Sequence, residues 1–246
     1  MGKDIKCIFE RTEKKYLLSK EQYELLLEKS KEYIKSDKYG VTSICNLYFD
    51  TEDSELIRTS IEKPLYKEKL RLRSYGTPTS EDSKVFLEIK KKYDGVVYKR
   101  RVSMSLKESE EYLNKGIKPE CENGQIIREI DYIIEHYNLK PKLFLAYDRI
   151  AYNGIEDVAL RITFDTNIRS RENDLSLMAG SYGDNLIDDN TYLMEIKANG
   201  GMPLWLVDLL STLEIYPLSF SKYGNIYKRS IMEKLNADTE IIENVI

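Results

Sequence analysis

The chain has 246 residues, enough to bury a sizeable hydrophobic core, and with 33% charged and 41% hydrophobic residues its composition is that of a globular protein. The net charge of −4 argues against a nonspecific nucleic-acid binder, which needs a cationic surface. No apolar run reaches the about 18 residues of a membrane span, and the first residues, MGKDIKCIFERTE, hold no signal-peptide core. The sequence therefore predicts a soluble protein of the cytoplasm.

Cysteine and histidine are too few to suggest a metal centre built from them. Cys7, Cys45 and Cys121 are scattered without the paired spacing of a metal site, so they are expected to be small buried residues in a reducing compartment. The only histidine, His136, lies in the amphipathic stretch QIIREIDYIIEHY and is expected on a helix surface. A histidine-based metal cluster and a serine–histidine triad are thereby excluded.

Alternating residues and turn signals predict about eight strands and six helices. Neither an internal repeat nor a linker divides the chain, so one domain over residues 1–246 is expected, with an acidic tail at about 236–246. In chain order the predicted strands are 7–18, 41–50, 66–74, 84–92, 96–104, 142–152, 157–166 and 190–198. The predicted helices are 19–34, 53–62, 105–114, 125–137, 203–213 and 221–235.

Short local signals mark the ends of several of these elements. Asp94-Gly95 predicts a tight hairpin between the fourth and fifth strands. Asn153-Gly154 predicts a turn between the sixth and seventh strands. Ser19, followed three residues later by Gln22, predicts a capping box at the start of the first helix.

The expected fold class is α+β, an eight-stranded antiparallel β-barrel with helices packed outside. Closure into a barrel leaves no exposed strand edge, which makes it the economical arrangement for eight antiparallel strands. In such a fold the outward strand faces are buried against helices and should be apolar. The inward faces are free to be polar.

The segment KEKLRLRSY, residues 67–75, tests this expectation because lysines and arginines alternate with Leu70 and Leu72. For one strand, a solvated cationic face is the simpler interpretation. The same separation recurs in other strands, for example Leu87 and Ile89 against Glu88, and this favours a charged interior. Cations taken out of water need an anion, and a mixture of Arg and Lys suits a phosphate chain. Carboxylates among them, Glu13, Glu88 and Glu195, suit Mg²⁺ or Mn²⁺ bridging carboxylate and phosphate.

Nine short strings, in this order and spacing, resemble the VTC domain, the polyphosphate polymerase branch of the triphosphate tunnel metalloenzyme (CYTH-like) superfamily. The resemblance covers residues 8 to about 235 and implies a tunnel of eight antiparallel strands. It also implies transfer of the γ-phosphate of ATP to a growing polyphosphate chain, with a divalent metal and a membrane partner protein outside this chain. The strings are RTEKKY, YFDT, KLRLRSY, FLEIKKK, YKRR, YDRIAY, LRITFDT, YLMEIK and FSKYGNIY.

The resemblance also implies roles for individual residues. Glu195 would hold the metal, and Ser221 would add a phosphate donor at the start of the last helix. The superfamily begins with a Glu-x-Glu-x-Lys strand, whereas Arg11 stands here in the first position, which lowers metal affinity and raises phosphate affinity. Glu13 is left as a weaker metal candidate, equally well explained as a salt-bridge partner of Arg11 or a nearby lysine. The implied phosphate-binding cations are Lys15, Arg71, Arg73, Lys90, Lys99, Arg149, Arg161 and Lys222.

Three alternatives remain open on the sequence. A triphosphatase would use water in place of the phosphate acceptor. A polyphosphate-binding subunit would keep the cations without turnover. A single-stranded nucleic-acid binder would use tyrosines for stacking, but many of the 19 tyrosines fall in predicted helices, where packing explains them, so nucleic acid is not an expected partner.

Overall fold

The computed structural model describes residues 11–120 and 123–243, and the surroundings of side chains for residues 12–120 and 123–236. Cys7 and Cys121 lie outside the described residues, and Cys45 is buried as expected. The expected helix-surface position of His136 is confirmed, since it is exposed in the last turn of its helix.

The strands form one large sheet, in which the described ladders are antiparallel and the spatial order of the strands differs from their order in the sequence. Eight strands follow the order β1-β10-β8-β7-β3-β4-β5-β6, while the short β2 pairs with β7 and β9 with β8. Over the described residues no ladder joins β1 to β6, so the sheet is open at these ends and the expected barrel closure is not confirmed. The strands are β1 Arg11–Ser19, β2 Ile34–Ser36, β3 Thr42–Asp50, β4 Tyr66–Tyr75, β5 Lys84–Tyr93, β6 Val96–Ser105, β7 Lys140–Gly154, β8 Arg161–Arg171, β9 Asp184–Asn185 and β10 Thr191–Asn199.

All six predicted helices are present, which confirms an α+β architecture. The first helix is shorter than predicted: it ends at Lys29, because Ile34 is buried in a core and belongs to β2, paired with β7. The last helix is longer and includes part of the expected tail. The helices are α1 Lys20–Lys29, α2 Glu55–Ile61, α3 Leu106–Lys115, α4 Gly124–Tyr137, α5 Leu204–Thr212 and α6 Lys222–Glu243.

The chain divides into two compact units, each assembled from three segments of sequence. Unit 1 contains residues 1–42, 148–167 and 187–220, and unit 2 contains residues 43–147, 168–186 and 221–246. The division falls within β7 and β8, so each of these strands contributes residues to both units. Each unit has its own hydrophobic core and is described separately.

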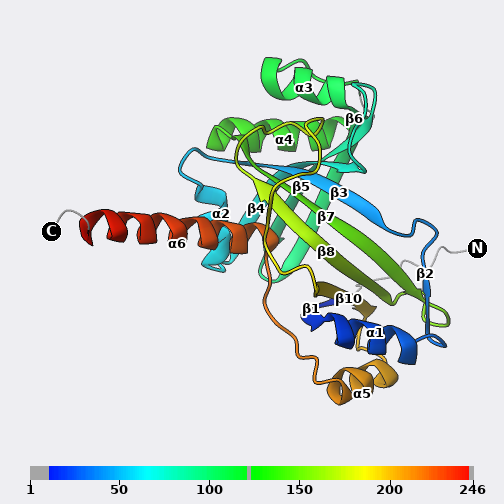
Figure 1. Ribbon diagram of the computed structural model, residues 1–246. Coiled ribbons are helices and arrows are strands. Elements are labelled where there is room, and N and C mark those ends of the chain that lie inside the picture. Colours follow the sequence, from blue (N-terminus) through cyan, green and yellow to red (C-terminus); the bar gives the residue numbers. More distant parts are fainter. Residues whose placement is uncertain (1–10, 121–122, 244–246) are drawn as a thin grey trace, which may run out of the picture. The chain divides into compact units, whose positions relative to one another are not determined.

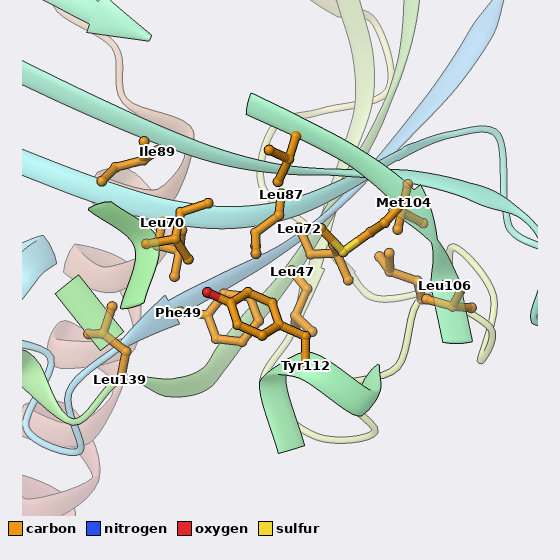
Figure 2. Close-up of a cluster of buried hydrophobic side chains, with 14 of the residues drawn as sticks. Leu47, Phe49, Leu70, Leu72, Leu87, Ile89, Met104, Leu106, Tyr112 and Leu139 are labelled. Carbon is orange, nitrogen blue, oxygen red and sulfur yellow. The ribbon is translucent and has the colours of Figure 1, made fainter. Parts of the chain in front are cut away.

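The core of unit 2 lies on one face of β3, β4, β5 and β6, where α3 and α4 cover it (Figure 1). Leu70 and Leu72 of β4 and Leu87 and Ile89 of β5 point into this core and are almost fully buried (Figure 2). Because successive strand residues point to opposite faces, the residues between these leucines point away from the helices. The apolar half of KEKLRLRSY is therefore the packing face, as the sequence predicts.

The core of unit 1 is built in the same way from β1, β8 and β10 with α1 and α5. Tyr16 of β1, Phe164 of β8 and Met194 of β10 are buried together with Leu26 of α1 and Leu206 of α5. The register places Tyr16 opposite Met194, and Met194 opposite Phe164, so one continuous row of apolar side chains crosses three strands. The opposite row is free for polar residues.

Of the two turns predicted from short sequence signals, one is present and the other is not. Asp94 and Gly95 have positive φ values of 43° and 82° and join β5 to β6 in a two-residue turn, as predicted. The predicted turn at Asn153-Gly154 is wrong, since both residues still belong to β7. Gly154 is needed there for close approach, because a Cβ at this position would lie 2.2 Å from the carbonyl oxygen of Asp157 in the loop that follows.

The expected helix start at Ser19 is confirmed. The Ser19 hydroxyl accepts the backbone N–H of Gln22, and the Gln22 side chain accepts the backbone N–H of Ser19. Across residues 11–120 and 123–243, none of the helices combines the length and the apolar character that a membrane crossing requires.

Candidate functional site

One face of β4, β5 and β6 points away from the unit 2 core. Between the cross-strand pair Arg73–Phe86 at one end and the pair Lys67–Lys92 at the other, this face carries eight cations and one carboxylate. The carboxylate is Glu88, which lies between Arg71 on β4 and Arg101 on β6 in the ladder register. We call this surface the cationic face. Its cations are Lys67, Lys69, Arg71, Arg73, Lys90, Lys92, Lys99 and Arg101.

Glu88 is the centre of a buried charge cluster within the cationic face. Its side chain is 1% exposed, and its Oε2 accepts from Arg71 Nε at 2.8 Å and pairs with Arg71 Nη2 at 2.7 Å. Arg73 Nη1 lies 3.8 Å from the same oxygen, and Lys99 Nζ lies 3.1 Å from Oε1. Arg101 Nη1 lies 3.9 Å from Oε1 as well. The alternating cations are thus not an ordinary solvated surface, because four of them converge on one buried carboxylate.

Polar groups from neighbouring strands hold the two arginines of this cluster in place. Arg73, 6% exposed, donates through Nε to the Asn46 side chain at 2.8 Å and through Nη2 to the Tyr147 hydroxyl at 3.3 Å. The Asn46 amide in turn donates to the carbonyl of Leu145 at 3.0 Å. These contacts fix the guanidinium before any ligand binds, which lowers the entropic cost of binding an anion.

Tyr48 adds a second hydroxyl to the cluster. Arg71 Nη1 donates to the Tyr48 hydroxyl at 3.1 Å. Burial raises the pKa of Tyr48, but Arg71, Arg73 and Lys69 outweigh it and lower the pKa to about 8. A tyrosine hydroxyl this acidic is a strong hydrogen-bond donor toward an anion.

The start of α6 brings Ser221 and Lys222 into unit 2 beside Tyr147. Lys222 Nζ lies 4.3 Å from the centre of the Tyr147 ring, and the Ser221 hydroxyl accepts the backbone N–H of Gly224 at 3.2 Å. Tyr223 fixes this end of the helix, since its hydroxyl donates to the buried Asp50 carboxylate at 3.0 Å. Lys222 and Arg73 therefore share a contact with the Tyr147 side chain.

Unit 1 carries a different arrangement, in which carboxylates and ammonium groups alternate. Lys15 Nζ lies 3.3 Å from Glu13 Oε1 and 3.8 Å from Glu195 Oε2. Lys197 Nζ pairs with Glu195 Oε1 and lies 4.0 Å from Glu13 Oε2. Burial raises the pKa of Glu195, but Lys197, Lys15 and Arg149 outweigh it, and the pKa is lowered. Glu195 is therefore ionised near neutral pH, as a metal ligand must be.

The other two predicted cations of unit 1 are engaged with side chains of the same unit. Arg149 makes a bidentate pair with Asp165, with Nε to Oδ1 at 2.6 Å and Nη2 to Oδ2 at 2.7 Å. Arg161 donates to the Asn153 side chain at 3.1 Å and to Asp37 at 3.3 Å. A phosphate at either arginine has to share the guanidinium with these partners or displace them.

Comparisons with known proteins identify the family. The profile of the VTC domain matches residues 10–231, which is most of the chain. The chain belongs to the VTC domain family. Subunit 4 of the vacuolar transporter chaperone complex of Schizosaccharomyces pombe is 24% identical over 191 residues, in a match that covers 69% of this chain and 26% of that protein. The chain thus spans about a quarter of the length of this relative.

The likeness to solved structures concerns the fold of this VTC domain alone. The crystal structure of a candidate adenylate cyclase from Bacillus halodurans matches with a TM-score of 0.52 at 18% identity. The match covers 85% of this chain and 92% of that one. The shared fold has a large antiparallel sheet with helices, which agrees with the α+β class expected from the sequence.

The VTC domain groups its predicted site residues by unit. Arg71, Arg73 and Lys99 meet at Glu88 in unit 2, and Lys90 stands beside them on the same face. Lys15, Glu13 and Glu195 meet in unit 1. The residue Arg11 belongs to β1, but its side chain lies outside the described surroundings.

Sequence reasoning missed the uncharged residues that position the arginines. Asn46, Tyr48 and Tyr147 lie on β3 and β7, strands whose polar face was not assigned. The signal that points to Asn46 is its place in the apolar run Ile44 to Phe49, since a buried amide there needs a partner.

A divalent cation fits unit 1 only if a bound phosphate supplies some of the oxygen atoms that coordinate it. Within 11–120 and 123–243, no group of three or more His, Cys, Asp and Glu side chains is placed to hold a metal. Glu195 and Glu13 are close to the same two ammonium groups, so a hard cation held there takes one or two carboxylates and draws its remaining ligands from phosphate and water. This is the usual arrangement for Mg²⁺ on phosphate substrates.

Acid is expected to weaken the VTC domain through Glu88. Burial raises the pKa of Glu88, but Arg71, Arg73 and Lys99 outweigh it and lower the pKa to about 2, from an ordinary value of 4.5. A carboxyl whose pKa is lower in the folded state stabilises above its unfolded pKa and loses this as pH falls through the folded pKa. The contribution, about 3 kcal/mol, should therefore be lost between about pH 4.5 and pH 2.

Urea unfolding at a series of pH values measures this loss. The matched comparison is Glu88→Gln, whose stability should change less steeply with pH over the same window, since the titrating group is gone. Equal slopes for the two proteins would show that Glu88 keeps an ordinary pKa.

Proposed function

We propose that this VTC domain transfers the γ-phosphate of ATP to a growing polyphosphate chain with the help of Mn²⁺ or Mg²⁺. The observation that carries the proposal is the cationic face, where eight cations stand against the single carboxylate Glu88. A surface this rich in fixed cations suits a linear polyanion, and its mixture of Arg and Lys suits phosphate oxygens. The family and the relative in the vacuolar transporter chaperone complex support the same chemistry.

The proposed roles follow the two groups of side chains. Arg71, Arg73 and Lys99 bind phosphate oxygens, and Lys90 and Lys222 add charge in the same unit. In unit 1, Glu195 holds the metal with Glu13 as a weaker contributor, and Lys15, Arg149 and Arg161 bind phosphate. Ser221 donates a hydroxyl, and Arg11 adds a cation at the start of β1.

Phosphoryl transfer asks for positioning and charge neutralisation more than for proton transfer. Negative charge spreads over the equatorial oxygens of the transferred group, and fixed guanidinium groups neutralise it. A bound divalent metal supplies further charge neutralisation on the triphosphate. The attacking terminal phosphate is already anionic near neutral pH, so no general base is needed.

The test is to incubate the purified protein with ATP and Mn²⁺, resolve the products on a gel stained for polyphosphate, and assay ADP and free phosphate. A ladder of long chains with matching ADP is the expected result. Free phosphate without a ladder would replace the proposal by a triphosphatase. The closed tunnel through which the chain would pass remains a prediction, as does a cytoplasmic location.

A polyphosphate-binding subunit without turnover is the second candidate, and one observation favours it. Glu13 and Glu195 are both paired with lysines, and no third metal ligand accompanies them in the part of the chain that the structure describes. Tight polyphosphate binding with neither ADP nor free phosphate formed would support this candidate. For both candidates, the relative is a subunit of a complex, which suggests that this chain also has a partner protein. The membrane partner expected from the resemblance would be such a protein.

A further inference from the structure

Four lysines at one end of the cationic face oppose each other in like-charge pairs. In the antiparallel register Lys69 is the partner of Lys90, and Lys67 is the partner of Lys92. We call these four residues the lysine ladder. Like charges directly opposite one another destabilise a sheet, and the next pair along, Arg71 with Glu88, shows the compensated alternative.

Three of these lysines have no carboxylate to compensate them. Among the described residues, no Asp or Glu oxygen lies within 4 Å of Lys67, Lys69 or Lys92. Lys67 donates to the carbonyl of Ser60 at 2.9 Å, which satisfies one hydrogen bond but not the charge. The ladder therefore holds positive charge that the protein does not neutralise.

Lys69 is the most confined member of the ladder. Burial lowers the pKa of Lys69 to about 8, and Lys67 and Lys90 act in the same direction, while Tyr48 and Asp50 oppose them. Asp50 cannot serve as a full counterion, because its oxygens already accept from the backbone of α2 and from the Tyr223 hydroxyl. Lys69 Nζ lies instead 6.0 Å from the centre of the Tyr223 ring.

The opposite face of the same hairpin shows that this charge imbalance is specific. There Lys91 lies 3.9 Å from Glu68 and 3.7 Å from Glu129, and Arg100 also pairs with Glu129. The cations Lys91 and Arg100 on this face pair with carboxylates beside α4, whereas among the described residues Lys69 and Lys92 on the other face have no carboxylate within 4 Å. An ordinary solvated surface would mix carboxylates into both faces.

We propose that the lysine ladder binds the part of a long polyphosphate chain that extends beyond the phosphates at Arg71 and Arg73. This rests on the proposed function, since it takes polyphosphate as the ligand. A strand advances about 3.4 Å per residue, so the row from Arg73 to Lys67 covers about 20 Å. A long chain contacts both ends of this row, whereas tripolyphosphate contacts one. The ladder therefore selects for chain length.

The test compares binding of long-chain polyphosphate and of tripolyphosphate to the purified protein without ATP, by calorimetry. In the double variant Lys69→Gln/Lys92→Gln, the Kd for the long chain should rise about tenfold, with a smaller dependence on salt. The Kd for tripolyphosphate should rise by a much smaller factor. The matched control is Lys91→Gln/Arg100→Gln, which removes the same charge from the opposite face and should leave both Kd values near those of the wild type.

Several outcomes would overturn the inference. One is an equal loss of affinity for both ligands, and another is an equal loss in the control double variant. Tighter binding of a single-stranded oligonucleotide than of long polyphosphate would assign the ladder to nucleic acid. Lys69→Arg/Lys92→Arg keeps the charge and should restore long-chain affinity, which separates binding from folding effects.

The outcome is independent of turnover. If the protein forms no polymer from ATP but the double variant loses long-chain affinity selectively, the polymerase proposal fails and the ladder stands. If the protein makes polymer and the double variant binds long chains with the wild-type Kd, the proposal about the lysine ladder is wrong and the polymerase proposal is unaffected.

Discussion

Arg73→Ala is expected to lower the rate of polyphosphate synthesis by about a hundredfold or more, the usual cost of losing one fixed charge donor to a transition state. Arg73 is held by Asn46, Tyr147 and Glu88, so its guanidinium is in place before phosphate arrives. Alanine removes both the charge and the fork. The measurement is the initial rate of polyphosphate formation at saturating ATP and Mn²⁺, together with the thermal unfolding midpoint.

Two companion variants separate the causes. Arg73→Lys keeps the charge but not the planar fork, so its rate should fall between those of the wild type and Arg73→Ala. Arg100→Ala removes an arginine from the opposite face of β6, where Glu129 is its partner, and should keep a rate near that of the wild type. A folded Arg73→Ala protein with a normal rate would remove Arg73 from the phosphate site.

Glu195→Gln is expected to reduce metal-dependent turnover by a similar factor, because the amide keeps the shape of the side chain but lacks the charge that holds a hard cation. Glu195 is ionised in unit 1 between Lys15 and Lys197. Mn²⁺ binding in the presence of tripolyphosphate, followed by electron paramagnetic resonance, reports the metal without depending on turnover. The variant should bind Mn²⁺ more weakly in this assay.

Glu13→Gln is the matched comparison for Glu195. Its side chain is 40% exposed against 12% for Glu195, so it holds a cation less firmly and its loss should cost less in both assays. Equal effects of the two variants would make them joint ligands. Normal Mn²⁺ binding by Glu195→Gln would assign the metal elsewhere.

The sequence predicted those parts of the fold that depend on nearby residues. Alternation in β4 and β5 separated Leu70 and Leu87 from Arg71 and Glu88 because strand geometry has a period of two. The tight turn at Asp94-Gly95 and the cap at Ser19 are equally local. These features need no knowledge of distant segments.

Features that depend on distant partners were not predictable in the same way. Asn153-Gly154 looks like a turn, but Asn153 pairs with Lys35 and Gly154 with Ile34 of the distant β2, so both residues extend β7. Arg149 was predicted as a phosphate ligand, and its bidentate pairing with Asp165 depends on how two separate strands lie together. Asn46 likewise acquires its role only when β3 and β4 pair.

Glu88 gives the cationic face a resident counterion that any polyanion has to compete with. Each guanidinium that turns toward a phosphate gives up part of its attraction to this carboxylate, so the net free energy gained per contact is a small difference between two large ones. When a phosphate leaves, Glu88 again neutralises the vacated cation. Successive positions of a phosphate chain along the part of the face around Glu88 then differ little in free energy, which is what a surface needs if a growing polymer is to slide over it without being trapped.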